Sequence, residues 1–316
     1  MLRLTNKVQV GNYILAGVVS VEIDSSWALL TDSCKIMLPS NIWHQGKFVN
    51  LADAELIKKG DPITVELGYD GLNDLVFTGF VDSIQAGSPV TVIGQDYMWL
   101  LKKKAQNLSY KKIDLESLLR DLLPAAINFK AVGRSLGQFR ITKASPAEVL
   151  SELKKSYYLH SWFRGNTLYS GLAYWPETLE SHSFSFGVNI IEDGSELTFK
   201  KAEDNRIKVR AISMLPDNSK IEVEVGDIEG DVRTLHFYNL AKAELEKIAE
   251  ESIKTLRYDG YSGSFLTFGQ PMVNHGDIVE IEDPKYNRAG QYLVKRVLRT
   301  FGAQGYRQKI YLDRKA

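Results

Sequence analysis

The sequence predicts an α+β protein, mainly β, with two related, strongly twisted β-barrel domains and a small α/β module inserted between them. Three observations favour this fold class. Alternating apolar and polar residues dominate both ends of the chain, helical periodicity dominates the middle, and one hairpin pattern occurs twice. The chain has 316 residues, 44% hydrophobic and 25% charged, which is enough for two or more domains with separate cores.

The repeated pattern is a hairpin that opens on Gly-Asp. One copy runs from Gly60-Asp61 to Ile84, and the other from Gly276-Asp277 to Thr300, 216 positions further on. Each copy has the spacing of one strand face, so we expect its matched apolar residues to be buried on the same face. The matched pairs are Ile63 with Val279, Val65 with Ile281, Phe77 with Leu293, and Val81 with Val297.

Chance similarity of two alternating hairpins is the competing interpretation. The order of elements argues against it, because in each half paired strands come first, an amphipathic helix follows, and the Gly-Asp hairpin comes after the helix. A chain that contains the same half-barrel twice is expected to be part of a larger assembly.

Residues 1–105 are expected to form the first β domain. A short helix is predicted before its Gly-Asp hairpin, because Asn50 is a suitable N-cap, residues 51–57 have apolar residues at helical spacing, and Gly60 can end the helix. The other predicted elements are strands at 18–23, 34–38 and 90–93 and a helical turn at 96–104.

Residues 106–181 predict the α/β module. Asp114 is a suitable N-cap for a leucine-rich helix that stops near Pro124. The run Ser145-Pro146-Ala147-Glu148 combines a cap, a proline at the first helical position and the glutamate of a capping box, so a second helix is predicted to begin there. Strands are expected at 138–142, 159–163 and 167–170.

Residues 182–316 are expected to form the second β domain, with a barrel-like sheet. Its long helix, at 239–256, has apolar residues on one face and Glu and Lys on the other. The predicted strands are at 184–191, 198–201, 206–213, 221–225, 232–238, 264–268, 277–282, 291–298 and 308–312.

Charge and cysteine content exclude several classes of function. Lys plus Arg equals Asp plus Glu, at 39 each, so no net positive field favours nucleic acid as a partner. Cys34 is the only cysteine, which excludes an internal disulfide and a thiolate metal site, and we expect it to be buried in a strand. No secretory signal and no run of eighteen apolar residues occur, so we expect no membrane segment and synthesis in a reducing cytoplasm.

Candidate catalytic and ligand-binding residues are weak throughout. Gly133 to Gly137 lacks the Lys-Ser or Lys-Thr of a phosphate loop, and the acidic pairs Glu192-Asp193, Glu203-Asp204 and Glu282-Asp283 lie in predicted turns. We therefore predict no catalytic residue, no metal and no cofactor. The histidines are too scattered to share a metal; they are His44, His160, His182, His236 and His275.

The aromatic residues favour contact over catalysis, although core packing accounts for most such residues in proteins. One group, Trp162, Tyr169, Tyr174 and Trp175, follows the second predicted helix. We predict that a second group, which comprises Tyr258, Tyr261 and Phe265, lines a contact with another subunit.

Short segments spread over essentially the whole chain carry a resemblance to a known family. They are Val18 to Pro39, Gly60-Asp61, Phe77 to Ile84, Val92 to Asp96, Ser145 to Leu150, Gly165 to Tyr169, His275 to Val279 and Gly290 to Val294. Together they resemble phage baseplate hub proteins of the late-control protein D family.

The resemblance implies two tail-tube-like domains in each chain. Three copies would then form a homotrimeric ring with pseudo-six-fold symmetry, which adapts a six-fold tail tube to a three-fold central spike. The implied partners are the chain itself, the tail tube protein and the central spike protein, in the virion tail or baseplate, and the aromatic contact could also face the tube. Because the sequence ends at Ala316, soon after the last predicted strand, we expect the spike to be a separate chain. The alternative is a carbohydrate- or peptidoglycan-acting enzyme of the tail tip, with aromatic residues lining its cleft.

Overall fold

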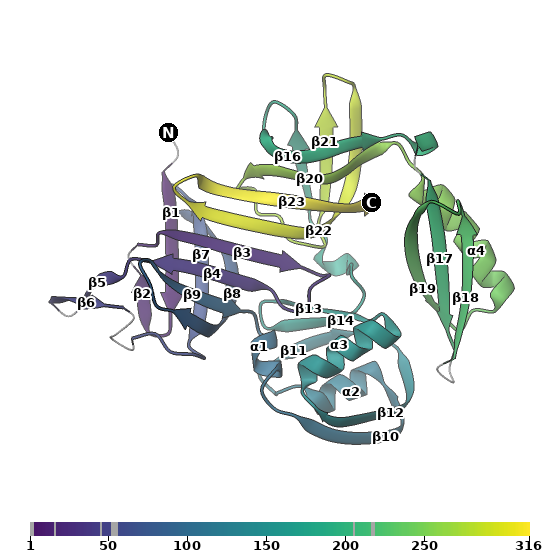
Figure 1. Cartoon of the computed structure of the whole chain (residues 1–316), viewed down its shortest axis with the longest axis horizontal. Coiled ribbons are helices and arrows are strands. Elements are labelled where there is room, and N and C mark those ends of the chain that lie inside the picture. The colour runs from purple at the N-terminus through teal and green to yellow at the C-terminus, as the bar shows by residue number, and fades with distance from the viewer. Residues whose placement is uncertain (1–2, 16, 45, 52–55, 205, 216–218) are drawn as a thin grey trace.

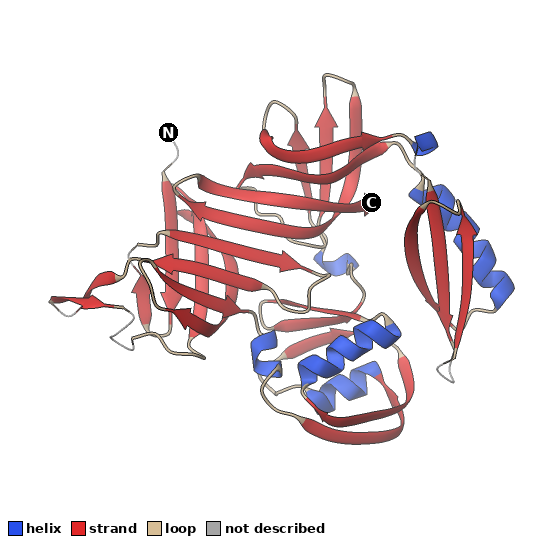
Figure 2. Cartoon of the chain, in the orientation of Figure 1, coloured by secondary structure: helices blue, strands red, loops and turns tan. Residues whose placement is uncertain are grey.

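The computed structural model describes residues 3–15, 17–44, 46–51, 56–204, 206–215 and 219–316. The protein is mainly β, as predicted, and one 13-stranded sheet joins its two ends (Figures 1 and 2). The strand order in this sheet is β16-β20-β23-β22-β3-β4-β9-β8-β7-β1-β2, and β21 and β15 are attached beside β22.

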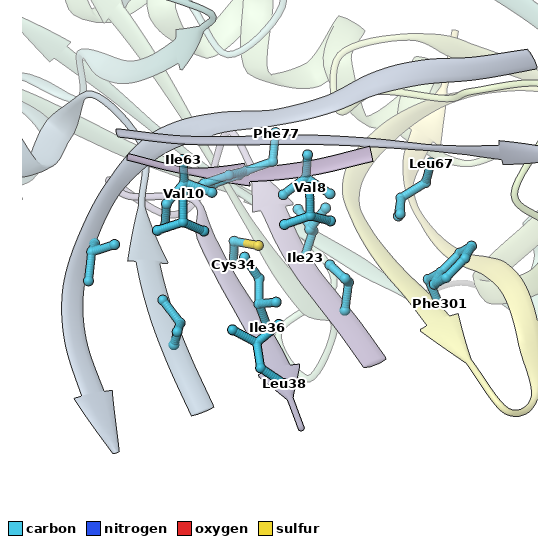
Figure 3. Packing of buried hydrophobic residues seen from close by; sticks show 14 of the residues in the cluster. Val8, Val10, Ile23, Cys34, Ile36, Leu38, Ile63, Leu67, Phe77 and Phe301 are labelled. Atoms are coloured by element: carbon cyan, nitrogen blue, oxygen red, sulfur yellow. The ribbon is translucent and has the colours of Figure 1, made fainter. Parts of the chain in front are cut away.

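The first domain surrounds an apolar core that includes the fully buried Cys34 (Figure 3). Burial raises the pKa of the Cys34 thiol, so this cysteine behaves as a core residue. The elements of the domain are β1 (Leu4–Val10), β2 (Tyr13–Leu15), β3 (Ser20–Ser26), β4 (Ser33–Leu38), β5 (Asn41–His44), β6 (Lys47–Asn50), β7 (Pro62–Tyr69), β8 (Leu72–Gln85), β9 (Val90–Gln95) and α1 (Met98–Leu101).

The short helix predicted after Asn50 falls largely on residues 52–55, which lie outside the described residues. On either side of that gap the described chain is not helical. Asn50 is the last residue of β6 and pairs with Asn41, and residues 56–59 form an irregular segment that leads into the Gly-Asp turn.

The module below the first domain in Figure 1 has its own apolar core, formed largely by leucines of α2 and α3. Both predicted helix starts are confirmed: Asp114 accepts a hydrogen bond from the Ser117 N–H at 2.9 Å, and Ser145 and Glu148 form the reciprocal capping box. The elements are β10 (Gln106–Asp114), α2 (Leu115–Leu122), β11 (Asn128–Ala131), β12 (Ser135–Ala144), α3 (Pro146–Tyr157), β13 (His160–Arg164) and β14 (Thr167–Gly171).

The second domain returns to the large sheet, and its strand β22 lies between β3 of the first domain and β23 (Figure 1). Its elements are η1 (Pro176–Thr178), β15 (Ser181–Ser185), β16 (Ile190–Lys200), η2 (Ala202–Asp204), β17 (Ile207–Met214), β18 (Lys220–Gly226), β19 (Asp231–Tyr238), α4 (Lys242–Leu256), β20 (Gly260–Phe268), β21 (Ile278–Asp283), β22 (Arg288–Gly302) and β23 (Gly305–Lys315).

Three strands that we expected in the second barrel-like sheet form a separate subdomain instead. β17 pairs antiparallel with β18 and parallel with β19, and α4 packs on this small sheet at the far end of the molecule (Figure 2). The prediction was wrong because the apolar face of these strands is covered by α4 and not by the barrel. The helix is therefore part of an insertion between β16 and β20, and not part of the repeated unit.

Candidate functional site: the repeated sheet and its junction

The two Gly-Asp motifs adopt the same local structure. Gly60 and Gly276 have φ angles of +93° and +92°, in the left-handed region that glycine tolerates best. In each motif the following aspartate, Asp61 or Asp277, accepts a hydrogen bond at 2.7 Å from the backbone N–H three residues before it. The motif is therefore a hydrogen-bonded turn that leads into the first strand of the hairpin.

The same backbone hydrogen bonds close the base of each hairpin. Gly60 N donates to Val81 O at 2.8 Å and Val81 N donates to Asp61 O at 2.8 Å. In the second copy Gly276 N donates to Val294 O at 2.8 Å, and Val294 N donates to the carbonyl of the following aspartate at 2.9 Å. Val81 thus corresponds to Val294, 213 positions away, whereas the opening strands correspond at 216 positions.

The return strand of the second hairpin is therefore three residues out of the predicted register. The first hairpin closes with a tight turn between Tyr69 and Leu72 and carries a bulge after Val65. The second has shorter arms and a longer connection, from Asp283 to Arg288. The Gly-Asp motif determines where a hairpin begins, but the length of the arms decides which residues return to that point.

A second bulge supports the corrected correspondence. The pairing of β8 with β9 shifts between Val81 and Ser83, and the pairing of β22 with β23 shifts between Val294 and Arg296, which is the same place relative to the Gly-Asp contact. Beyond the bulge, Ile84 pairs with Val92 as Val297 pairs with Ile310. Val297 is therefore the counterpart of Ile84 and not of Val81.

All eight residues predicted for the hairpin core are buried in the structure. Their exposed fractions are 8% for Leu293, 6% for Phe77, and at most 1% for the others, which are Ile63, Val65, Val81, Val279, Ile281 and Val297. Leu293 differs from the prediction in its surroundings: it borders a cavity beside Leu235 and Leu256 of the inserted subdomain. An odd shift in register turns a side chain to the other face of a strand, so the neighbouring Tyr292 occupies the core in its place.

The two halves share one order of strands. In the first it is β3-β4-β9-β8-β7-β1, and in the second it is β16-β20-β23-β22-β21-β15. One difference is that β1 runs antiparallel to β7, whereas β15 runs parallel to β21.

The halves are joined edge to edge through β3 and β22. These strands pair antiparallel from Ser26 with Arg296 to Val21 with Phe301. The guanidinium of Arg296 makes two hydrogen bonds of 2.6 Å to the carboxylate of Asp24, and this hydrogen bonding, together with the charge of Asp24, raises the pKa of Arg296. A bidentate pair of this kind fixes both the register and the direction of the junction.

Side chains from the second half also complete the core of the first half. Phe301 of β22 and Tyr306 of β23 belong to the first domain's apolar core, and Figure 3 shows Phe301 near Leu67. Tyr69 Oη donates to Tyr306 O at 2.7 Å. The junction is therefore a shared core as well as a shared sheet.

A carboxylate pair formed by the half-buried Asp32 and the buried Asp96 was not predicted from the sequence. Asp32 N donates to Asp96 Oδ2 at 3.0 Å, and Asp96 Oδ1 accepts from Met98 N at 3.0 Å, so the pair ties β4 to the start of α1. Burial raises the pKa of Asp32 to about 6, and burial together with the charge of Asp32 raises the pKa of Asp96 well above its usual value. The two aspartates are 64 residues apart, and each has the sequence context of an ordinary turn residue, so nothing in the sequence indicates that they interact.

The structure brings no metal or phosphate site together in the part of the chain that it describes. No cluster of three His, Cys, Asp or Glu residues is close enough to hold a metal ion. Burial lowers the pKa of His160 and of His236 to about 4, and that of His275 to about 3. The segment from Gly133 to Gly137 leads into β12 and not into a helix N-terminus.

Of the aromatic residues predicted at a contact, two lie in the core of the second domain. The exposed fractions of Tyr261 and Phe265 are 5% and 0%, which fits core packing better than a contact surface. Tyr258 is half-buried, and its hydroxyl oxygen accepts from the backbone N–H of Lys315 at 3.1 Å.

The other aromatic group ties the domains together. Trp162 and Tyr169 of the module form a small buried cluster with Trp175, which follows the module. Tyr174 accepts from Trp27 Nε1 at 3.0 Å and donates to Asp313 Oδ2 at 2.9 Å, so its hydroxyl connects the two ends of the chain.

The interpretation as a carbohydrate- or peptidoglycan-acting enzyme finds no support in these surfaces. A cavity of about 460 Å³ lies beside Trp27 and Tyr174, but the carboxylate among its described lining residues, Asp313, already accepts from Tyr174. A second cavity, of about 570 Å³, is lined by Glu192 and Asp283, and Asp283 accepts from the Tyr261 hydroxyl. Glycoside hydrolysis needs two carboxyl groups on opposite sides of the substrate, one that acts as an acid and one that acts as a base or nucleophile. In each cavity an aspartate that could serve is already bonded to a tyrosine hydroxyl.

Within the described residues, no helix has the length and hydropathy needed to cross a membrane. No protein-family model matches the chain, and no curated protein sequence matches it.

Two of the solved structures similar to the chain are tail proteins. A tail protein from Neisseria meningitidis has a TM-score of 0.64 at 18% identity, with 98% of this chain and 96% of that chain covered. The 43 kDa tail protein of prophage MuSo2 from Shewanella oneidensis has a TM-score of 0.64 at 17% identity, with 98% and 97% covered.

The likeness extends to a component of the type VI secretion system from E. coli, which is described as structurally similar to the T4 bacteriophage tail proteins gp27 and gp5. Its TM-score is 0.55 at 10% identity, with 98% of this chain and 77% of that chain covered. The chain therefore has the fold of phage tail proteins and of hub-like proteins, as the resemblance implied.

Proposed function

We propose that the chain is a structural protein of a phage or prophage tail, a baseplate hub that forms a homotrimeric ring at the tail tip. The observation that carries the proposal is the repeated sheet, in which two domains with the same strand order are joined edge to edge within one chain. The similarity of the fold to tail proteins over nearly the whole chain supports it.

A ring of three such chains contains six equivalent sheets. Six sheets can match a six-fold tail tube, while the inserted subdomain, which is present only in the second half, leaves three-fold features for a central spike protein. Assembly of the ring in the host cytoplasm, before it joins the virion, is part of the proposal. Of the three aromatic residues predicted at a contact, we retain Tyr258 alone, because it is half-buried whereas the other two are buried.

Sedimentation velocity and negative-stain imaging of the purified chain test this proposal. We expect a particle of about three times the 35.6 kDa chain mass, with a central hole. Tube and spike proteins of the same phage are added in a parallel sample, because they can promote assembly. A compact monomer in both samples would contradict the hub.

A further inference from the structure

The two strands that form the junction, β3 and β22, have counterparts in β16 and β8, and part of one edge of each counterpart is open. By strand order β16 is the counterpart of β3, and β8 is the counterpart of β22. In the described chain β16 is the last strand of the sheet, and its residues 196–200 pair with β20 alone. Residues 83–85 of β8 pair with β9 alone, so one edge of each segment is unpaired.

Matching pairing registers identify the equivalent residues on the first edge. Ile36 of β4 pairs with Val92, and its counterpart in β20, Phe265, pairs with Ile310. Two residues before them, Cys34 pairs with Ile23 as Gly263 pairs with Leu197. Ile23 of β3 therefore corresponds to Leu197 of β16, and the next three residues correspond in order up to Lys200.

Equivalent residues differ in exposure where the neighbouring strand is missing. Val297 of β22 lies opposite Ser25 of β3 and is 0% exposed, whereas its counterpart Ile84 is 36% exposed. On the other edge Ile23 is 1% exposed, whereas its counterpart Leu197 is only half-buried. The two open edges therefore carry apolar residues at the same positions as the junction, but no neighbouring strand covers them.

We propose that β16 of one chain pairs antiparallel with β8 of a second copy, in the register that β3 and β22 use within the chain. This register places Lys200 opposite Ser83, Phe199 opposite Ile84, and Thr198 opposite Gln85. The inference rests on the proposed ring and names the edges that close it.

The register pairs the apolar side chains of Phe199 and Ile84 across the two strands. Ser26, the counterpart of Lys200, donates from Oγ to Lys295 O across the junction, and Lys295 corresponds to Asp82. Lys200 of one chain therefore lies close to the backbone of Asp82 of the second copy, whose carboxylate is paired with Lys59 at 3.3 Å.

The arrangement also accounts for both open edges at once. Each chain has one edge of the β3 type and one of the β22 type left unpaired, so the contact is head to tail and repeats until the ring closes. Closure would cover backbone groups that otherwise present an edge for unspecific strand pairing.

Engineered disulfides test the register directly, because the native Cys34 is fully buried and does not compete. One variant carries Ser83→Cys with Lys200→Cys, and another carries Ile84→Cys with Phe199→Cys. Residues directly opposite in antiparallel strands have Cα atoms about 4.5–5.5 Å apart, which is within disulfide range. Two adjacent pairs are used because only one of them is a non-hydrogen-bonded pair, in which the side chains are closer.

The matched control is Gln85→Cys with Lys200→Cys, which is two residues out of register. Its diagonal Cα separation of about 7–8 Å is unfavourable for a disulfide. Circular dichroism of each reduced variant checks that it is folded. After mild oxidation we expect at least one matched pair to give covalent oligomers about tenfold above the control, with products ending at the closed trimer.

The outcomes separate the edge pairing from the proposed function. Matched cross-links in products that do not close at three would keep the edge pairing and overturn the trimeric ring. A trimer by sedimentation, with no more cross-linking in the matched pairs than in the control, would overturn the edge pairing alone and leave another occupant, such as the tube protein, for those edges. A monomer without cross-links would overturn both.

Discussion

At the scale of single residues, titratable groups with shifted pKa values determine how the stability of this protein depends on pH. The half-buried Asp32 is hydrogen-bonded through its backbone N–H to the buried Asp96, and the pKa of Asp32 is raised to about 6. A carboxyl group with a raised pKa favours the folded state at low pH, and that contribution is lost as pH rises from about 4, the unfolded pKa, through about 6. Three histidines have lowered pKa values and therefore increase the stability of the folded state as pH rises; they are His160, His236 and His275. The effect of the carboxyl groups is therefore measured by comparing a variant with the unchanged protein.

Asp96→Asn is the variant that isolates it. The substitution removes a carboxyl group whose pKa is raised well above its usual value, by burial and by the charge of Asp32. The melting temperature of the variant relative to the unchanged protein should therefore improve as pH rises from 4 to 7, even if the lost hydrogen bond lowers its absolute value. Thermal unfolding of both proteins across this range measures the difference, and parallel pH profiles would contradict the assignment.

At the scale of elements, the Gly-Asp turn is the unit that the two halves have in common. Its glycines have nearly the same φ angle but different surroundings. A Cβ atom on Gly60 would lie 2.9 Å from Cη2 of Trp99, whereas one on Gly276 would meet nothing closer than Arg164 Nη2 at 4.0 Å. The same turn is thus packed tightly in one domain and loosely in the other.

Gly276→Ala and Gly60→Ala form a matched pair of variants. We expect Gly276→Ala to lower the free energy of unfolding by about 1–2 kcal/mol, the cost of a left-handed alanine. Gly60→Ala should cost more, because Trp99 must also move. Urea unfolding of both variants gives the comparison, and equal losses would show that the Trp99 contact is easily relieved.

A feature could be predicted from the sequence when its interacting groups are close together along the chain. The capping box of Ser145 and Glu148 spans three residues, and it was predicted correctly. The partner of β3 could not be predicted, because Asp24 and Arg296 are 272 residues apart and nothing in either segment specifies the other. Leu293 was assigned to the wrong face because the length of a hairpin arm depends on its turn and bulges, which alternation alone does not reveal.

At the scale of the whole molecule, the fold consists of one continuous sheet with attachments. Lys200, the last residue of β16, pairs directly with Gly260, the first residue of β20, so the intervening subdomain emerges from the end of an existing hairpin. The module of residues 106–171 is likewise placed between two sheet segments and has its own core. The sheet is the common part of the two halves, and the attachments distinguish them.

Replacement of residues 201–259 by an Asn-Gly turn tests this description. A two-residue turn is a favoured link between antiparallel strands, so we expect the shortened chain to fold and to form the proposed ring without the contact that we assign to Tyr258. Its stability should fall, because Leu293 loses its cover from the subdomain. Sedimentation and circular dichroism measure the result, and an unfolded product would show that the subdomain is required by the sheet.

The direct pairing of Lys200 with Gly260 also has a consequence for how such proteins diversify. The two strand ends lie about 5 Å apart, so a domain whose own termini are adjacent can be inserted between them without disturbing the sheet. Proteins with this sheet can therefore carry different domains at this position while the sheet stays constant. The same position is a display site for an engineered domain, and in the proposed ring it would present three copies at fixed spacing.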